Sequence, residues 1–447
     1  MPPEPLAPLD LAFWHLESPR HPMHLGALGV FEASDAAAAG RAAALLAERC
    51  AAGPGLRMRI RDTWLPAGGA VREPAGRFDP AEHVRLMPPA ADFHAVAGEV
   101  MARPLDRGRP PWEARVIPAP DGRRFAVLFA FHHALADGLR ALTLAAGVMD
   151  PVGGAPARPS PAAPAASPGG WGFLDPVALA RRQAADARRQ LAEAGRAAGI
   201  GAGLVRASWG LPTTPPVLAA AGAGGRLTAG AVLDLDDVHH VRKRTGGTVN
   251  DVLIAVVAGA LRRWLEERGE PVGRLRPRAL IPVSRRRPRA AHPQGNRLSG
   301  YLVRLPVSDP DPLGRMRAVR RTMDRRKEAG PDQGAGAVAL LADLVPPLGH
   351  RLGGPVVARA ARLLFDVLVT SVPLPSLGLR LAGCPLTEVY PLAPLAQGHA
   401  LAVAVSTYRG RVHYGLVADA RALPDVDVLA GALGAELAEL RRAALAG

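Results

Sequence analysis

The chain has 447 residues, of which 48% are hydrophobic and 21% are charged, a composition typical of a globular protein that can bury a large core. Its 55 basic and 40 acidic residues give a net charge of +15, but aromatic residues are only 4% and are not interleaved with a Lys/Arg run, so we expect no nucleic-acid partner. A positive net charge without that pattern favours the binding of anionic small molecules and of anionic membrane surfaces.

The N-terminal segment MPPEPLAPLDLAFWHLE lacks the basic start and long apolar run of a signal peptide. No uncharged apolar stretch reaches the roughly 18 residues of a transmembrane helix. Cys50 and Cys384, the two cysteines, permit one disulfide without requiring it, and they match no metal-site spacing. We therefore expect a cytoplasmic protein whose membrane contacts are peripheral.

Two halves joined by a crossing region account best for this length, because single domains are usually about 200 residues or fewer. A Pro/Ala/Gly/Ser-rich stretch at 151–170, a helical stretch near 176–199 and a loop at 208–225 make up the crossing region. We predict an N-terminal domain at 1–150, a crossover linker with a helix at 151–225 and a C-terminal domain at 226–447.

Both halves mix strands with helices, which predicts the α/β fold class. In the first half, the continuous apolar run FAVLFAF at 125–131 predicts a fully buried strand, and a helix is predicted at 139–149. The second half predicts a strand running into a helix at 231–246 and a long amphipathic helix at 248–269. Further strands are predicted at 278–286, 295–307 and 365–373, and at 401–419 as a hairpin that turns at Tyr408–Arg411.

Two adjacent histidines, His132 and His133, follow the predicted strand at 125–131. An isolated buried histidine is most often a hydrogen-bonded core residue. This pair lies where a buried strand ends, which is where α/β proteins expose reactive groups. Asp137 is a good N-cap for the helix that follows, and Gly138 permits close approach of the backbone. The segment can therefore hold an imidazole rigidly.

The chemistry open to that imidazole is limited by the motifs that the sequence lacks. The chain contains neither the GxSxG nucleophile elbow of serine hydrolases nor an HExxH metal pair, and we expect no metal. A histidine general base remains, which removes a proton from a bound hydroxyl, amine or thiol while that group attacks an activated acyl carbon. Local backbone contacts would fix the tautomer so that one ring nitrogen faces the substrate.

The segment HHALADG at 132–138 resembles the HHxxxDG motif of acyltransferases with the chloramphenicol-acetyltransferase-like fold. Other segments narrow the resemblance to the bacterial wax ester synthase/diacylglycerol acyltransferase family, and only the crossing region is unmatched. These segments are PLAPLDLAFWHLESPRHPMHLGALGVFE (5–32), PLDRGRPPWEARVI (104–117), GGTVNDVLIAVVAGALRRWL (246–265), IPVSRRR (281–287), QGNRLSGYLVRLP (294–306) and VYPLAPLAQGHALAVAVSTYRGRVHYGLVAD (389–419).

The resemblance implies two related α/β sandwich domains with the active site in a tunnel at their interface. It also implies an enzyme, attached peripherally to a membrane or lipid droplet, that joins acyl-CoA to diacylglycerol, to a fatty alcohol, or to both. Acyl-CoA would be a co-substrate, and no cofactor is implied. Within the motif, His133 would be the general base, His132 and Asp137 would hold its loop, and Gly138 would keep the acyl-CoA channel open.

Asn250 and Asp251 begin the long helix at 248–269, where capping is the simplest interpretation. A helix N-terminus also carries unpaired N–H groups, and an Asn amide there could donate to the oxyanion of a tetrahedral thioester adduct. The resemblance supports a catalytic role for Asn250. Arg285 and Arg287 could bind the phosphates of coenzyme A, although a solvated loop would have the same composition.

Two alternatives stay open. A condensation domain of a nonribosomal peptide synthetase shares HHxxxDG and would acylate an amine held on a carrier protein, but the chain shows no carrier or adenylation region. A catalytically silent lipid-binding protein on the same fold is the second alternative. It stays open because Ser371-Val372-Pro373-Leu374-Pro375 stands where the family usually has Asn-Val-Pro-Gly-Pro.

Overall fold

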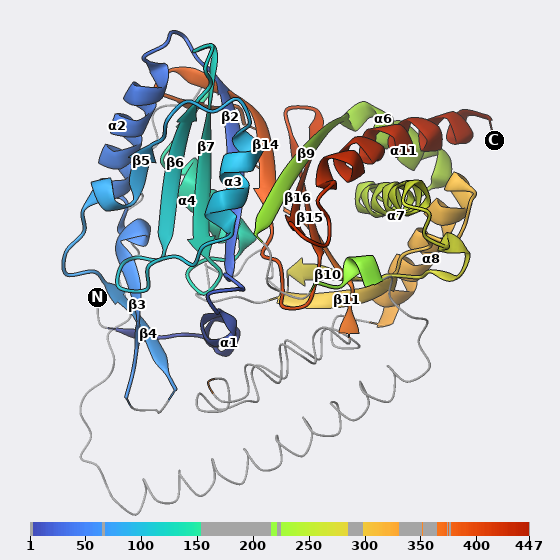
Figure 1. Ribbon diagram of the computed structural model, residues 1–447, viewed down its shortest axis with the longest axis horizontal. Coiled ribbons are helices and arrows are strands. Elements are labelled where there is room, and N and C mark those ends of the chain that lie inside the picture. Colours follow the sequence, from blue (N-terminus) through green and yellow to red (C-terminus); the bar gives the residue numbers. More distant parts are fainter. Residues whose placement is uncertain are drawn as a thin grey trace, which may run out of the picture.

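The structure, a computed structural model, describes residues 3–64, 68–152, 216–220, 225–284, 298–329, 351, 364–372, 374 and 377–446. Two β-sheets stand side by side, and helices pack against each of them (Figure 1). The predicted α/β fold class is confirmed. The predicted crossing region at 151–225 lies mostly outside the described residues.

The first sheet has seven strands in the order β5-β6-β7-β2-β14-β13-β8. Their bounds are β5 (Val84–Leu86), β6 (Trp112–Pro118), β7 (Arg124–His132), β2 (His24–Glu32), β14 (Cys384–Leu392), β13 (Leu379–Leu381) and β8 (Asp150–Pro151). The core beneath helix α2 (Ala38–Ala52) also contains residues of α4 (Gly138–Ala146), while α3 (Phe93–Met101) packs on the other face. Strands β13 and β14 come from the C-terminal half and complete this sheet.

A small sheet, β1 (Glu4–Pro5), β4 (Ala70–Pro74) and β3 (Met58–Asp62), lies next to helix α1 (Pro8–Leu16) at the N-terminus. The described residues also contain four short 3-10 helices: η1 (Pro54–Arg57), η2 (Pro80–Glu82), η3 (Pro216–Leu218) and η4 (Val272–Arg274). Helix α1 leads directly into the segment before β2.

The second sheet has six strands in the order β11-β10-β12-β15-β16-β9. Their bounds are β11 (Leu298–Arg304), β10 (Arg278–Ser284), β12 (Val367–Ser371), β15 (Leu401–Tyr408), β16 (Arg411–Asp419) and β9 (Arg226–Asp234). One face is covered by a layer of helices (Figure 1): α6 (Leu235–Thr245), α7 (Val249–Glu267), α8 (Pro312–Ala329) and α11 (Val426–Ala446).

Local sequence signals set several of these element bounds, and the corresponding predictions are confirmed. Every residue of the apolar run at 125–131 is buried in β7. The turn between β15 and β16 uses Arg409 and Gly410 at φ values of 48° and 75°, as a two-residue hairpin turn requires. Helix α7 starts with a capping box, in which Asp251 N–H donates to Thr248 and the Asp251 carboxylate accepts from Thr248 N–H.

The two sheets share an apolar core, which we call the inter-sheet core. It joins Leu28, Val30, Ala126 and Leu128 of the first sheet to Ala402, Ala404 and Val417 of the second. The backbones approach closely here, since a Cβ atom on Gly415 would lie 2.0 Å from the Pro391 carbonyl oxygen. Helix α3 also packs on β9, where a Cβ on Gly98 would lie 2.6 Å from the Arg226 oxygen. The two halves therefore form one packed unit.

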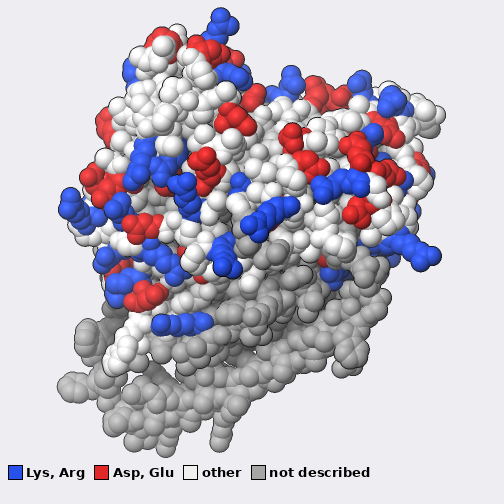
Figure 2. Space-filling view, in the orientation of Figure 1, with Lys and Arg blue, Asp and Glu red and all other residues white. Residues whose placement is uncertain are grey.

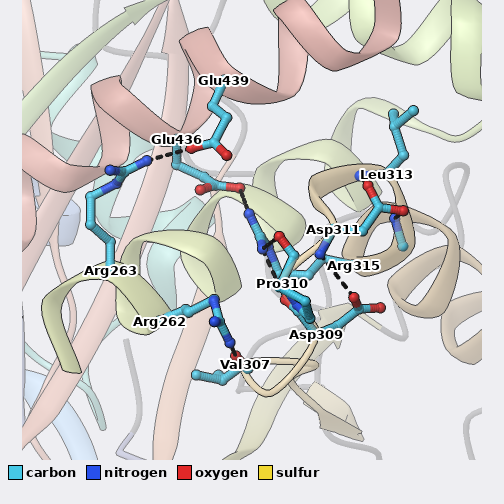
Figure 3. A network of polar contacts seen from close by, with 11 residues as sticks. Arg262, Arg263, Val307, Asp309, Pro310, Asp311, Leu313, Arg315, Glu436 and Glu439 are labelled. Atoms are coloured by element: carbon cyan, nitrogen blue, oxygen red, sulfur yellow. Dashed lines mark hydrogen bonds and ion pairs between the residues drawn. The ribbon is translucent and has the colours of Figure 1, made fainter. Parts of the chain in front are cut away.

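Charged side chains occur both buried between helices and on the surface. Within the helical layer, Arg315 of α8 and Glu436 of α11 form a buried ion pair at 2.5 Å, surrounded by the polar network in Figure 3. On the face in Figure 2, basic and acidic side chains are interspersed over the described surface. Within the described part of the chain, we find no helix with the length and apolar character needed to cross a bilayer.

Candidate active site

The histidine pair stands at the end of β7, and α4 begins five residues after His133. His132 is the last residue of the strand, and the backbone N–H of His133 donates to the Met23 carbonyl, 2.8 Å away. Asp137 is the N-cap of α4 and accepts from the Arg140 backbone N–H at 2.8 Å, so the predicted cap is confirmed. Backbone and cap contacts therefore fix both ends of the motif.

A buried arginine holds the turn between these ends. Nη2 of Arg72 on β4 donates to the Ala134 carbonyl at 2.9 Å, and the same nitrogen lies 3.6 Å from the Asp10 carboxylate of α1. Both charged side chains are almost fully buried. Buried charge-assisted contacts of this kind make the turn rigid, because moving either partner would leave an uncompensated charge.

Helix α1 covers the histidine pair with two aromatic rings. The Phe13 ring stacks on the His133 ring with centroids 4.0 Å apart and an interplanar angle of 24°. The Trp14 ring meets His132 edge-on at 5.0 Å. The orientation of each imidazole is therefore fixed by an aromatic neighbour on one helix.

Glu17, just after α1, places a carboxylate beside His132. Its Oε2 lies 3.5 Å from His132 Nε2 and 3.1 Å from Arg107 Nε, and its Oε1 accepts from Met23 N–H at 3.1 Å. Burial alone would raise the pKa of Glu17, but His132, Met23 N–H and Arg107 together lower it to about 2. The site thus contains a buried, ionised carboxylate.

His133 is held neutral at physiological pH. Burial lowers its pKa to about 4, although a hydrogen bond of the ring to the residue's own backbone and the charge of Asp137 act in the opposite direction. The residue is only 9% exposed. A neutral imidazole at a fixed position can accept a proton from a substrate that reaches it.

Gly138 lies where the two halves meet. A Cβ atom on this residue would be 3.5 Å from both methyl groups of Val372, which follows β12 in the second half. Val372 belongs to the segment that departs from the family pattern, Ser371–Pro375, of which Pro373 and Pro375 lie outside the described residues. The motif and this segment are therefore neighbours in space.

The other predicted site residue that the structure describes is Asn250. Asn250 is the second residue of α7, and capping is done by Thr248 and Asp251 instead. Helix α7 packs mainly on α11, α8 and α6. Arg285 and Arg287 lie outside the described residues.

Four residues that support the site were not singled out from the sequence: Phe13, Glu17, Arg72 and Arg107. Local patterns could not reveal them, because each reaches the motif or its Glu17 neighbour from a distant segment of the sequence. In the antiparallel pair β2–β7, His24 lies opposite His132, which brings the end of α1 next to the motif. The described residues contain no group of three His, Cys, Asp or Glu side chains arranged as metal ligands.

Two family models together match most of the chain. The wax ester synthase/diacylglycerol acyltransferase catalytic domain matches residues 6–253, and the C-terminal domain of the same family matches 294–441. A Mycobacterium tuberculosis H37Rv protein described as a probable diacylglycerol O-acyltransferase is 31% identical over 407 residues, covering 86% of this chain and 84% of its own. A second protein so described, from strain CDC 1551, is 29% identical and covers 98% and 99%.

Solved structures show the same fold. A wax ester synthase/diacylglycerol acyltransferase from Marinobacter aquaeolei VT8 superposes with a TM-score of 0.69 at 23% identity, covering 98% of this chain and 99% of its own. The starter condensation domain of rhizomide synthetase in complex with C8-CoA gives 0.55 at 16% identity, with 99% and 95% covered. The predicted two-domain chloramphenicol-acetyltransferase-like fold is confirmed.

Proposed function

The chain belongs to the wax ester synthase/diacylglycerol acyltransferase family, and from this premise we propose that it makes triacylglycerol from acyl-CoA and diacylglycerol, and wax esters from acyl-CoA and fatty alcohols. The family establishes that the chain is an acyltransferase. Diacylglycerol as the acceptor is supported by its mycobacterial relatives, which are described as probable diacylglycerol O-acyltransferases.

In the proposed mechanism, His133 is the general base. Its neutral ring takes the proton of the acceptor hydroxyl while the hydroxyl oxygen attacks the thioester carbonyl carbon. The tetrahedral adduct then collapses: the new C–O bond stays, the C–S bond breaks, and the coenzyme A thiolate takes the proton from His133. The single observation that carries this proposal is the position of His133, a buried neutral imidazole fixed at a strand end beside the contact between the two halves.

We propose supporting roles for five further residues. His132 and Asp137 shape the loop, which their backbone and capping contacts support. The adduct's oxyanion would be stabilised by Asn250 or by nearby backbone N–H groups. Arg285 and Arg287 would bind the phosphates of coenzyme A. The reaction uses acyl-CoA as a co-substrate and needs no metal or prosthetic group, because one imidazole supplies both proton transfers.

Both substrates carry long apolar chains, so we place the reaction at the surface of a membrane or lipid droplet, with the protein attached peripherally. The net charge of +15 supports attachment to anionic lipid. The active site would lie in a tunnel between the halves, which the proximity of Gly138 to Val372 supports.

The test is product identification with purified protein and labelled palmitoyl-CoA, offered in turn with diacylglycerol, hexadecanol or an aminoacyl thioester. Labelled triacylglycerol and wax ester are the expected products. Amide alone would favour a condensation domain and contradict the proposal. No product with any acceptor would also contradict it and would favour a silent lipid-binding protein.

A further inference from the structure

We propose that Glu17 is a positioning residue, which fixes the tautomer of His132 and the backbone that carries His133. Its effect on catalysis rests on the proposed function, whereas its effect on His132 rests on geometry alone. Three sets of contacts carry the inference.

The first set determines where the proton of His132 lies. The backbone N–H of Ala134 donates to Nδ1 of His132 at 3.0 Å, so Nδ1 is an acceptor and carries no proton. The single proton of the neutral ring is then on Nε2, which lies 3.5 Å from Glu17 Oε2. The His132 side chain is 0% exposed and the Glu17 side chain 4%, so no bulk water competes for this contact.

The second set keeps the carboxylate ionised. The groups around His132 are Glu17, Arg107, His24 on the paired strand and His133. Arg107 contacts Glu17 through Nε, donates to the Trp14 carbonyl and lies over the Trp14 ring, 4.1 Å from its centroid. A paired carboxylate favours the Nε2–H tautomer of His132, as an acceptor of fixed negative charge does in other carboxylate–histidine pairs.

The third set connects Glu17 to His133 through the backbone. The Glu17 carboxylate accepts from Met23 N–H at 3.1 Å, and the Met23 carbonyl accepts from His133 N–H at 2.8 Å. Glu17 also ends helix α1, whose Phe13 stacks on the His133 ring. One carboxylate therefore stabilises the position of both histidines, without contact to the substrate.

The kinetic test compares Glu17→Gln with Glu17→Asp in the palmitoyl-CoA and diacylglycerol assay. Glutamine keeps the size of the side chain but removes its charge and one acceptor oxygen. We expect kcat to fall roughly 10- to 100-fold with KM for palmitoyl-CoA nearly unchanged, because positioning acts on the chemical step. Aspartate keeps the charge and should restore part of kcat.

A matched control is Glu436→Gln, which removes a carboxylate that is equally buried and paired with Arg315 in the helical layer. It should lower stability and leave the kcat of the folded protein unchanged. If Glu17→Gln leaves kcat unchanged in an active enzyme, or lowers it no more than Glu436→Gln does, the inference is wrong.

A spectroscopic test does not depend on turnover. In ¹⁵N-histidine-labelled protein, with the His132 signals assigned by their loss in His132→Gln, the ring shifts should report the Nε2–H tautomer. Glu17→Gln should mix the tautomers or shift them toward Nδ1–H. If the wild-type protein makes no ester, the proposed function fails, and this spectrum still decides the inference: unchanged His132 shifts in Glu17→Gln would overturn it.

Discussion

At the scale of single residues, the proposed base owes its charge state to burial. His133 is stacked under Phe13 and fixed by the Met23 carbonyl, and desolvation lowers its pKa to about 4 from an ordinary 6.5. A histidine with an ordinary pKa would be partly protonated at neutral pH and would lose activity on mild acidification. The low pKa keeps His133 able to accept a proton throughout the physiological range.

This gives a pH prediction. Protonation of His133 removes the base, so activity falls only as the pH approaches about 4, well below the ordinary value of 6.5. We expect kcat at saturating substrate, corrected for the folded fraction, to change by less than about two-fold between pH 8 and pH 6. A kcat that is halved near pH 6.5 would show that the imidazole is not desolvated as described.

Gly138 gives a second prediction at this scale. An added Cβ would lie at ordinary contact distance from Val372, 3.5 Å, so Gly138→Ala should fold normally. If the acyl-CoA passes between the halves here, the extra methyl narrows its path, and KM for palmitoyl-CoA should rise several-fold. Gly40→Ala on α2, where a Cβ meets nothing within 4 Å, is the control that should leave KM unchanged. An unchanged KM in Gly138→Ala would remove this residue from the channel.

At the scale of elements, local patterns in the sequence were sufficient for several strands and helices but not for the elements that they pair with or pack on. The apolar run of β7, the Asp137 cap of α4 and the Tyr408–Arg411 turn are each determined by residues close in sequence, and each was predictable. Glu17 reaches His132 only because β2 pairs with β7 in one register. That pairing depends on side chains far apart in the chain, and the hydrophobic periodicity of a single segment does not reveal it.

Helix packing gives a prediction at the element scale. Gly259 of α7 leaves room for the Glu436 carboxylate of α11, since a Cβ there would lie 2.0 Å from Glu436 Cδ (Figure 3 shows the pair of Glu436 with Arg315). Gly259→Ala should therefore lower the free energy of unfolding by about 1 to 3 kcal/mol in urea denaturation. Gly434→Ala on α11, where a Cβ meets nothing, should instead raise it by about 0.5 to 1 kcal/mol. Equal effects of the two changes would contradict the packing described.

At the scale of the whole molecule, the inter-sheet core joins the halves into one unit. The sequence predicts two α/β halves, and no local pattern in it indicates that residues 379–392 complete the first sheet as β13 and β14. Membership of a sheet is a long-range property, and an apolar strand segment has the same composition in either sheet. Val372, which follows β12 of the second sheet, lies beside Gly138 of the histidine motif in the first half.

Buried histidines spread through the molecule predict acid destabilisation. Burial lowers the pKa of His24, His133 and His413 to about 4, whereas unfolding returns each to about 6.5. Between these pH values the unfolded state binds more protons than the folded state. The free energy of unfolding is therefore highest above about pH 6.5 and falls as the pH drops toward 4.

Urea denaturation at pH 7 and pH 5 measures this loss. His413→Leu should reduce the difference between the two pH values, because among the described residues neither ring nitrogen of His413 has a hydrogen-bond partner and leucine does not titrate. Equal stability of the wild-type protein at the two pH values would contradict the burial of these histidines as neutral rings.

The most direct test of the central claim is the turnover of His133→Ala beside the wild-type protein, with labelled palmitoyl-CoA and diacylglycerol at saturating concentrations. We expect triacylglycerol formation by the wild-type protein and none above background by the variant, whose circular dichroism should be the same and whose thermal midpoint should agree within a few degrees. A folded variant, with its identity confirmed by mass, that turns over at the wild-type rate would contradict the role of His133 as the base.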